Sequence, residues 1–400
     1  MTTMTNAEEA IGGMVADAAK HVTPIRHDLH QHPELMYEES RTSKRVCEEL
    51  DALGVEYVPG LAGGTGVVAY LPASEAGGRT IGLRADMDAL PIEEATGVPY
   101  TSVHKGVMHA CGHDGHTSIL LGAARVLKNA PQRKNNIIFV FQPAEEGGAG
   151  GRRMCEDGAI DGTRIGTKVD EMYGLHGWTE LELGKLSTRN GPLLAATDEF
   201  DVTVKGQGGH AAEPHKCLDP VVVSAQIVSA LQSIASRRVG PLDSVVLTVA
   251  SIHAGHAHNV IPDEAKIRGT IRTLLPETRK LAQDEFRRIT SGIASAMGAS
   301  AEIEWHDGYP VTFNHDAPTE RFRTIARAAI GDEHVIDEPH PTMGGEDFSY
   351  YGAHAPACFY LLGLAPKGQK YPRVHTPRFD FNDDAIPLGI EMMVRLGLGD

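Results

Sequence analysis

The segment from Met108 to His116 holds one cysteine, three histidines and one aspartate within nine positions. Cys111 and His113 are two positions apart, so both side chains can face the same way in an extended loop. Thiolate and imidazole are ligands that divalent transition metals favour. The segment therefore predicts a metal site just before a helix. The alternative interpretation is a polar loop in which Asp114 caps that helix.

A second candidate for metal chemistry is the pair Glu145 and Glu146, which follows the apolar run 139–141. Adjacent carboxylates at the end of a buried strand are unfavourable unless a cation or a proton neutralises them. Neighbouring side chains in extended chain point in different directions, so one can bind a metal while the other faces a substrate water. Two solvated glutamates at a turn are the alternative. His176 and His375 would each be ordinary core or surface histidines if they stood alone, and only the whole set suggests a role for them.

The elements around these residues alternate between strand and helix. Residues 67–71, 80–84 and 137–141 are short apolar runs typical of buried strands, and apolar residues repeat at helical spacing over 119–127. This alternation predicts an α/β fold with a mostly parallel sheet and helices on both faces. The loops at the carboxyl ends of such strands are where these sheets build their sites.

The pattern changes after residue 190, which predicts a second domain. Strands and helices there follow the order β-α-β-β-α-β of a ferredoxin-like fold. We predict a discontinuous catalytic domain of residues 1–190 and 311–400, with residues 191–310 inserted between its parts. The elements expected in the insert are a strand at 200–204, a helix at 219–238, strands at 244–252 and 264–274, a helix at 276–297 and a strand at 301–305.

Length, charge and cysteine content restrict the class of protein. A chain of 400 residues is too long for one compact core, and its net charge of −16 argues against a nucleic acid or an anionic membrane as partner. No apolar run is long enough to span a bilayer, and the N-terminus lacks a basic start followed by an apolar stretch. The five cysteines have no CxxC spacing, which fits a reducing compartment, so a cytoplasmic location is expected.

Nine motifs spread over nearly the whole chain resemble the aminoacylase/carboxypeptidase clan of di-metal peptidases. The similarity is closest to the subgroup of hippurate hydrolases and plant indole-acetyl-amino-acid hydrolases. The motifs are HDLHQHPEL (27–35), GLRADMDALPI (82–92), MHACGHDGH (108–116), FQPAEEGG (141–148), GLHGW (174–178), GQGGHAAEPH (206–215), HNVIPDEA (258–265), GGEDFSYY (344–351) and VHTPRFDFND (374–383).

The resemblance implies a set of metal ligands and a general base. Glu145 would be the general base, and the Cys111 thiolate would bridge two ions. The implied ligands are Cys111, His113, Glu146, His176 and His375. Two divalent ions are expected, Mn²⁺ or Zn²⁺ before Co²⁺ or Ni²⁺, because the donor types alone do not choose among them. The resemblance also implies the inserted-domain architecture.

Further roles follow from the resemblance. Many relatives have a His-x-Asp pair and an aspartate bridge where this chain has Asp86, Asp88 and Cys111, so the two aspartates are expected to orient ligands. His210 would stabilise the oxyanion, in its own subunit or in a partner's. Asn259 and Arg272 would bind the substrate's carboxylate, for which a guanidinium fork is well suited.

The predicted activity is hydrolysis of the amide bond of N-acyl amino acids such as hippurate, giving a carboxylic acid and a free amino acid. The alternative is a dipeptidase or carboxypeptidase with the same two-metal chemistry. A thiol hydrolase with Cys111 as nucleophile and His113 as base, and a metal-binding scaffold without activity, are further alternatives. The expected partner is a small-molecule substrate, and a homodimer would form through the inserted domain.

Overall fold

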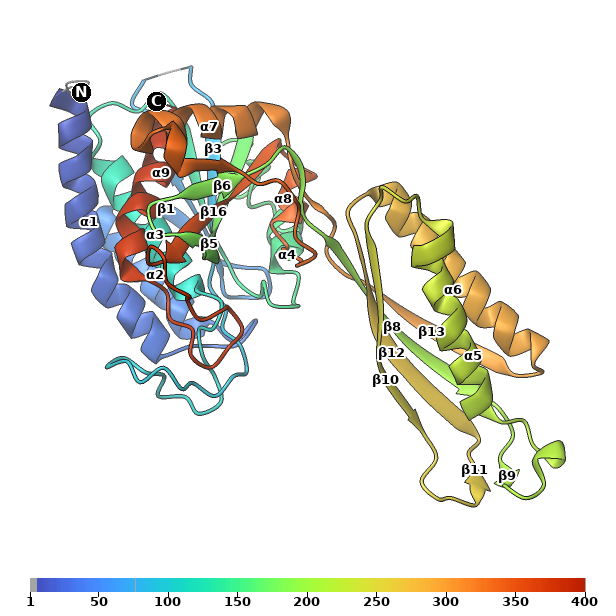
Figure 1. Ribbon diagram of the computed structural model, residues 1–400. Helices are drawn as coiled ribbons and strands as arrows, with labels where there is room; N and C mark the ends of the chain where they lie inside the picture. Colours follow the sequence, from blue (N-terminus) through green and yellow to red (C-terminus); the bar gives the residue numbers. More distant parts are fainter. Residues whose placement is uncertain (1–5, 76, 400) are drawn as a thin grey trace. The chain divides into compact units, whose positions relative to one another are not determined.

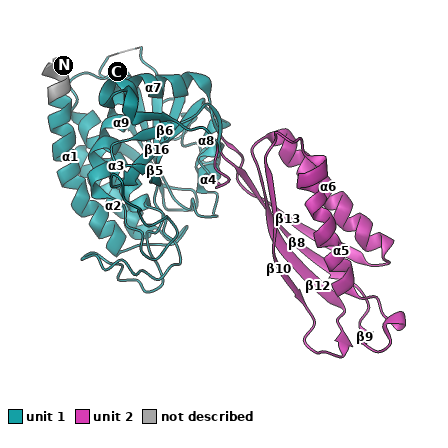
Figure 2. Ribbon diagram, in the orientation of Figure 1, with its two compact units in different colours: residues 1–193, 313–340, 347–400 teal, residues 194–312, 341–346 magenta. Residues whose placement is uncertain are grey.

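The computed structural model describes residues 6–75 and 77–399, which form two compact units (Figures 1 and 2). The large unit comprises residues 1–193, 313–340 and 347–400, and the small unit comprises residues 194–312 and 341–346. Residues 1–5, 76 and 400, which belong to the predicted catalytic domain, lie outside the described residues. Among the described helices, none is long and apolar enough to cross a bilayer.

The large unit is built on an eight-stranded sheet in the order β1-β2-β4-β3-β5-β16-β6-β15. Its four central strands β4, β3, β5 and β16 run parallel, and antiparallel pairs join β1 and β2 on one side and β6 on the other. The strands are β1 Glu56–Leu61, β2 Gly66–Leu71, β3 Thr80–Asp86, β4 Asn136–Gln142, β5 Glu171–Glu182, β6 Leu186–Thr188, β15 Val335–Asp337 and β16 Ala357–Ala365, with the short β7 Gly191–Leu194 and β14 Thr312–Asn314 beside them. All residues of β3 are buried, because the sheet is covered on both faces.

Helices of unequal length cover the two faces of this sheet. Phe359 and Tyr360 are neighbours in β16 and therefore point to opposite faces. Tyr360 stacks on Phe322 of α7, whereas Phe359 contacts Phe348 beside α8. The helices are α1 Asn6–Gln31, α2 Ser40–Leu53, α3 His113–Asn129, α4 Gly150–Glu156, α7 Asp316–Ile330, α8 Ser349–Gly352 and α9 Ile386–Leu398. The predicted α/β class, with a mostly parallel centre and helices on both faces, is confirmed.

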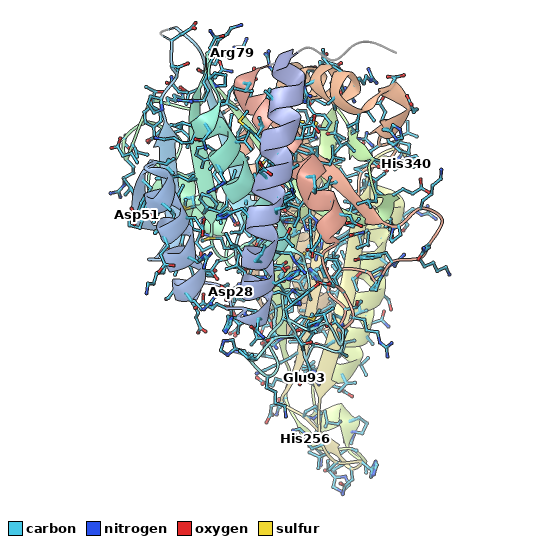
Figure 3. The ribbon with its side chains drawn as sticks, turned by 90° about the vertical axis from the view of Figure 1, so that its left-hand side faces the viewer. Asp28, Asp51, Arg79, Glu93, His256 and His340 are labelled. Carbon is cyan, nitrogen blue, oxygen red and sulfur yellow. The ribbon has the colours of Figure 1, made fainter. Side chains whose placement is uncertain are left out.

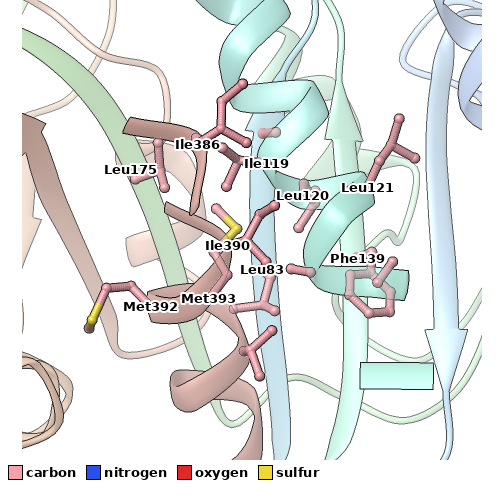
Figure 4. Close-up of a cluster of buried hydrophobic side chains, with 14 of the residues drawn as sticks. Leu83, Ile119, Leu120, Leu121, Phe139, Leu175, Ile386, Ile390, Met392 and Met393 are labelled. Carbon is pink, nitrogen blue, oxygen red and sulfur yellow. The ribbon is translucent and has the colours of Figure 1, made fainter. Parts of the chain in front are cut away.

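The main core of the large unit lies between the sheet and the pair α3 and α9 (Figure 4). Glycines let these two helices approach closely. A Cβ atom on Gly122 of α3 would lie 2.4 Å from Ile390 Cδ1, and one on Gly389 of α9 would lie 2.5 Å from Ile119 Cδ1. This packing holds the beginning of α3, which carries His113, against the centre of the sheet.

The small unit has a four-stranded antiparallel sheet in the order β10-β12-β8-β13, with α5 and α6 packed against it. Its core includes Phe200, Phe286 and the partly buried Trp305. Its elements are β8 Ala196–Lys205, β9 Gly209–His210, α5 Pro220–Ser233, β10 Val245–Ala254, β11 Val260–Ile261, β12 Glu264–Thr273, α6 Pro276–Ala296 and β13 Ser300–Asp307. The predicted β-α-β-β-α-β order is confirmed, and α5 and α6 both begin with a proline at a position where its missing N–H is tolerated.

Candidate metal centre

The carboxyl ends of β3 and β4 and the middle of the neighbouring parallel strand β5 bring predicted site residues together. β3 ends at Asp86, and β4 ends at Gln142, three residues before Glu145. β5, on the other side of β3, carries His176. Cys111 lies two residues before His113, at which α3 begins. Residues that are far apart in the sequence therefore meet near the carboxyl ends of the central strands, which is where open α/β sheets bind their ligands.

Cys111 lies at the middle of two groups of potential metal ligands. Its Sγ atom is 3.3 Å from Nε2 of His176 and 3.3 Å from Nε2 of His375. Ligand atoms of Cys111, His113 and His176 lie within 4.8 Å of one another, and so do those of Cys111, Glu146 and His375. The two groups share only the cysteine sulfur. This arrangement suits two adjacent ions with one thiolate between them.

The hydrogen bonding of His113 leaves one of its ring nitrogens for a metal. Its Nδ1 lies 3.2 Å from Oδ1 of Asp88, while its Nε2 is buried and makes no hydrogen bond in the described part of the chain. A buried ring nitrogen without a hydrogen bond is energetically unfavourable unless something else binds it. His113 therefore fits a metal ligand whose orientation is set by Asp88.

Asp88 also holds the segment that carries the two glutamates. Its Oδ1 accepts a hydrogen bond from the backbone N–H of Glu145 at 3.0 Å, and its Oδ2 accepts one from that of Glu146 at 2.9 Å. One buried carboxylate thus fixes a histidine and both glutamates. Ligand atoms of His113, Glu145 and Glu146 lie within 4.8 Å of one another.

Asp86 and His116 form a layer behind the ligands. His116 Nδ1 lies 2.7 Å from Asp86 Oδ1, and His116 Nε2 accepts a hydrogen bond from the backbone N–H of Gly177 at 2.8 Å. The carbonyl of Gly177 in turn lies 2.8 Å from Nδ1 of His176. Because both nitrogens of His116 are occupied, this histidine positions His176 and is not itself free to bind an ion.

A buried arginine neutralises part of this layer. Arg84 lies in the fully buried strand β3 and donates to Asp86 at 2.7 Å and to Asp347 at 2.9 Å. Asp347 also accepts from the backbone N–H of Gly151 at 2.7 Å. Sequence reasoning gave no role to Arg84 or Asp347. A charged residue inside an apolar strand was the available signal, because a buried guanidinium requires acidic partners.

Burial and charge shift the pKa values at the centre in opposite directions. Burial raises the pKa of the Cys111 thiol well above its usual range, and the carboxylates of Glu146 and Glu145 raise it further. Burial lowers the pKa of His176 to about 3. Burial also lowers the pKa of His113, but Asp86 and Asp88 outweigh that effect and raise it to about 10. The centre thus has an excess of acidic groups, which divalent cations would neutralise while favouring the thiolate.

His375 comes from a long loop that α1 helps to hold. Its backbone is in the left-handed region, with φ of 61°, and its N–H donates to the carbonyl of Ala110 at 2.7 Å. Five residues later, Asp380 accepts from Arg26 of α1 at 2.7 Å and from the hydroxyl of Tyr100 at 2.8 Å. These contacts fix the loop that delivers His375 to the centre.

The other predicted site residues belong to the small unit. His210 lies in β9, and its Nδ1 accepts the N–H of Ala212 at 3.0 Å, so its Nε2 carries the ring proton of the neutral side chain. Asn259 is next to it, because its carbonyl accepts the N–H of Ala211 at 3.0 Å. Arg272 lies near the C-terminal end of β12, and its side chain donates to the carbonyl of Met343 at 3.5 Å. The roles predicted for these three residues stay predictions.

Two features of the sequence have no place in the candidate centre. His256 lies in the exposed connection between β10 and β11, where its side chain points away from the ribbon (Figure 3). His30 is buried, but it binds Asp114 and Glu94 and none of the candidate ligands. Neither histidine therefore belongs to the candidate centre.

Comparisons with known proteins identify the family. The model of peptidase family M20/M25/M40 matches residues 82–398. The chain is 43% identical over 384 residues to N-acetyl-L-cysteine deacetylase of Bacillus subtilis, which covers 96% of this chain and 89% of that protein. It is 40% identical to thermostable carboxypeptidase 2 of Saccharolobus solfataricus, over 92% of each chain. The chain belongs to peptidase family M20/M25/M40.

A solved structure supports the same assignment. The crystal structure of the YXEP protein of Bacillus subtilis, described as a dinuclear metal binding peptidase from the M20 family, matches with a TM-score of 0.81 and 32% identity. The match covers 96% of this chain and 98% of that one. The resemblance seen in the motifs is thereby confirmed, and the protein is a metal-dependent hydrolase of the amidohydrolase and peptidase class.

Proposed function

We propose that this protein hydrolyses the amide bond of N-acyl amino acids, including hippurate-like compounds. The observation that supports the proposal is the pair of ligand groups that share Cys111, with the Glu145 carboxylate beside them. The Bacillus subtilis relative is named as an N-acetyl-L-cysteine deacetylase, which is an enzyme of this reaction class.

The chain's own residues account for binding and proton transfer. We propose that Cys111, His113, Glu146, His176 and His375 hold two divalent ions, Mn²⁺ or Zn²⁺ before Co²⁺ or Ni²⁺. Such ions supply Lewis acidity and lower the pKa of water. Glu145 takes a proton from the attacking water and gives it to the departing amine. Asp88 holds the backbone of Glu145 in place, and Asp86 holds His116.

The small unit supplies the remaining proposed contacts. The ring proton on Nε2 makes His210 a donor for the oxyanion, either in its own subunit or in that of a partner. Asn259 and Arg272 bind the carboxylate of the amino acid. We further propose that residues 1–190 and 311–400 act as the catalytic domain and that the insert 191–310 serves as lid and dimer contact. The five cysteines form no disulfide, which supports a reducing compartment such as the cytoplasm.

The test is amine release from N-benzoyl, N-acetyl and indole-acetyl amino acids and from plain dipeptides. Chelator-treated protein is measured with each divalent metal added back. Cleavage of the N-acyl compounds that returns with metal is the expected result. Cleavage that survives chelation would instead point to Cys111 as a nucleophile, and no cleavage of any compound would point to a scaffold.

A dipeptidase or carboxypeptidase is the second candidate. The Saccharolobus solfataricus relative is named as a carboxypeptidase and is nearly as similar to this chain. The same ligand groups and the same general base would serve that reaction. Cleavage of dipeptides without cleavage of any acyl compound in the panel would decide for it.

A further inference from the structure

The backbone that carries Glu145 and Glu146 is in an unfavourable conformation. Ala144 has a φ of 54° and Gly147 a φ of 93°, so the chain turns through the left-handed region on both sides of the two glutamates. A residue other than glycine in this region costs about 1 kcal/mol or more and persists only where the surrounding structure enforces it. Something must therefore hold Ala144.

Two buried carboxylates hold this backbone. The N–H of Ala144 donates to Oε1 of Glu39 at 2.8 Å, and the N–H groups of Glu145 and Glu146 donate to Asp88 at 3.0 and 2.9 Å. Three consecutive N–H groups are thus bound by two side chains from different segments. Asp88 fixes the two glutamates, and Glu39 fixes the strained residue in front of them.

Glu39 is itself fully buried and held by donors. It is 0% exposed, and it accepts hydrogen bonds from the N–H of Tyr37 at 3.0 Å and from the hydroxyl of Thr65 at 2.7 Å. The hydroxyl of Tyr37 donates to the carbonyl of Gly148 at 2.5 Å, beyond the far end of the glutamate pair. The segment 37–39 therefore contacts the loop both before and after Glu145 and Glu146.

We propose that Glu39 is a positioning residue that sets the directions of Glu145 and Glu146 by fixing the left-handed backbone of Ala144. The proposal rests on the proposed function, because it assigns Glu145 to proton transfer and Glu146 to an ion. Without the acceptor on Glu39, the N–H of Ala144 is buried and unpaired, and the backbone relaxes toward an ordinary conformation. That relaxation turns both carboxylates.

The contacts of Glu39 predict which substitution is tolerated. In Glu39→Gln, the amide oxygen still accepts from Tyr37 and Ala144, and the amide nitrogen donates to the Thr65 hydroxyl, which can also accept. Burial raises the pKa of Glu39 to about 7 against the lowering effect of the Thr65 hydroxyl, so a neutral side chain suits this site. In Glu39→Leu, the Ala144 and Tyr37 N–H groups lose their acceptor.

A second carboxylate on the same segment provides a matched control. Glu34 accepts hydrogen bonds from the backbone N–H groups of Arg41 and Thr42 at 2.9 and 2.8 Å, in the first turn of α2. Its side chain makes no hydrogen bond with the loop 143–148 in the described part of the chain. Glu34→Leu therefore removes a comparable set of bonds without releasing Ala144.

The experiment compares Glu39→Leu, Glu39→Gln and Glu34→Leu in the full chain. Two readouts are used: the absorption spectrum of the Co²⁺-loaded protein, whose bands depend on ligand geometry, and kcat and KM on the best N-acyl substrate of the parent. In Glu39→Leu we expect a shifted spectrum and a kcat lower by about 10-fold to 100-fold, as misplacement of a catalytic group predicts. KM should stay within about twofold. Glu39→Gln and Glu34→Leu should match the parent in both readouts.

Other outcomes overturn the proposal. If Glu39→Leu keeps the parent's spectrum and kcat, Glu39 does not position the glutamates. If Glu34→Leu causes the same losses, the effect is one of general stability. Should Glu39→Leu not fold, Glu39→Asp, whose shorter side chain withdraws from Ala144, is judged by the same readouts. If the parent cleaves no amide, the proposed function fails, and the Co²⁺ spectra still decide the role of Glu39.

Discussion

Glu145 and Glu146 are neighbours in the chain, but the site gives them different surroundings. Glu146 Oε1 lies 3.1 Å from Nε2 of His375 and shares a ligand group with Cys111, whereas Glu145 shares one group with His113 and Glu146 and another with Glu346 and Asp347. We expect Glu145→Gln to keep its metal and to lose about 10²-fold to 10⁴-fold in kcat, the usual contribution of general acid–base catalysis. Metal analysis and steady-state kinetics check this. Turnover at the parent's rate would remove Glu145 from the mechanism.

Cys111 allows a prediction about metal content. Because its sulfur lies between two histidines and belongs to both ligand groups, Cys111→Ser should weaken the binding of both ions. Equilibrium dialysis followed by elemental analysis measures the effect. Cys155→Ser is the matched control, because Cys155 is also a buried free thiol but lies in α4. Equal metal content in the two variants would contradict a bridging thiolate.

The sequence predicted the residues that meet at the centre better than the residues that hold them. Cys111, His113 and the glutamates stand in short motifs whose chemistry is visible locally. The contacts of Glu39 with Ala144 and of Arg84 with Asp347 join segments 105 and 263 positions apart. No local pattern encodes such partners, because they follow from the order of strands in the sheet.

At the scale of elements, the packing of α3 against α9 predicts a stability change. A Cβ atom on Gly122 would lie 2.4 Å from Ile390 Cδ1, and Ile390 is fully buried. We expect Gly122→Ala to lower the free energy of unfolding by about 1–3 kcal/mol, as overpacking does. Gly292 in α6 has open space around its Cα, so Gly292→Ala should raise the free energy of unfolding by about 0.5–1 kcal/mol. Urea unfolding measures both, and a loss in both variants would contradict the packing argument.

Burial distinguishes β2, β3 and β4, which were predicted, from β1, which was missed. β2, β3 and β4 are almost entirely buried, and their apolar runs identified them. β1 was missed because it is largely exposed at the edge of the sheet and contains Pro59 and Gly60, which disfavour strands. β6 and β15 have only three residues each, and β15 pairs with β6 at the end of the sheet, so neither run is long enough to identify a strand.

At the scale of the large unit, a buried ionic network predicts a dependence of stability on pH. His30 lies 2.9 Å from Oδ2 of Asp114 and 3.3 Å from Oε1 of Glu94. Burial lowers the pKa of His30, but Asp114 and Glu94 outweigh this and raise it from 6.5 to about 9. The folded state then holds the proton more tightly than the unfolded chain. The stabilisation is fully present below pH 6.5 and is lost as pH rises through about 9.

The measurement is urea unfolding of the parent and of His30→Gln between pH 6 and pH 9.5. The difference in free energy of unfolding between the two proteins should shrink with rising pH, with a slope of at most about 1.4 kcal/mol per pH unit. A difference that stays constant over this range would show that His30 does not carry the proton. The comparison cancels the groups that titrate equally in both proteins.

The place of β16 in the sheet has a consequence for how the molecule is made. β16 pairs with β5 in the centre of the sheet, but its residues, 357–365, follow the whole of the contiguous stretch 194–312. During synthesis, which begins at the N-terminus, one edge of β5 stays unpaired while the small unit already has all the strands of its own sheet. His375 and α9 leave the ribosome later still. The candidate centre is thus completed only after β16 and His375 have been made, and until β16 is made the nascent chain must keep an open strand edge from aggregating.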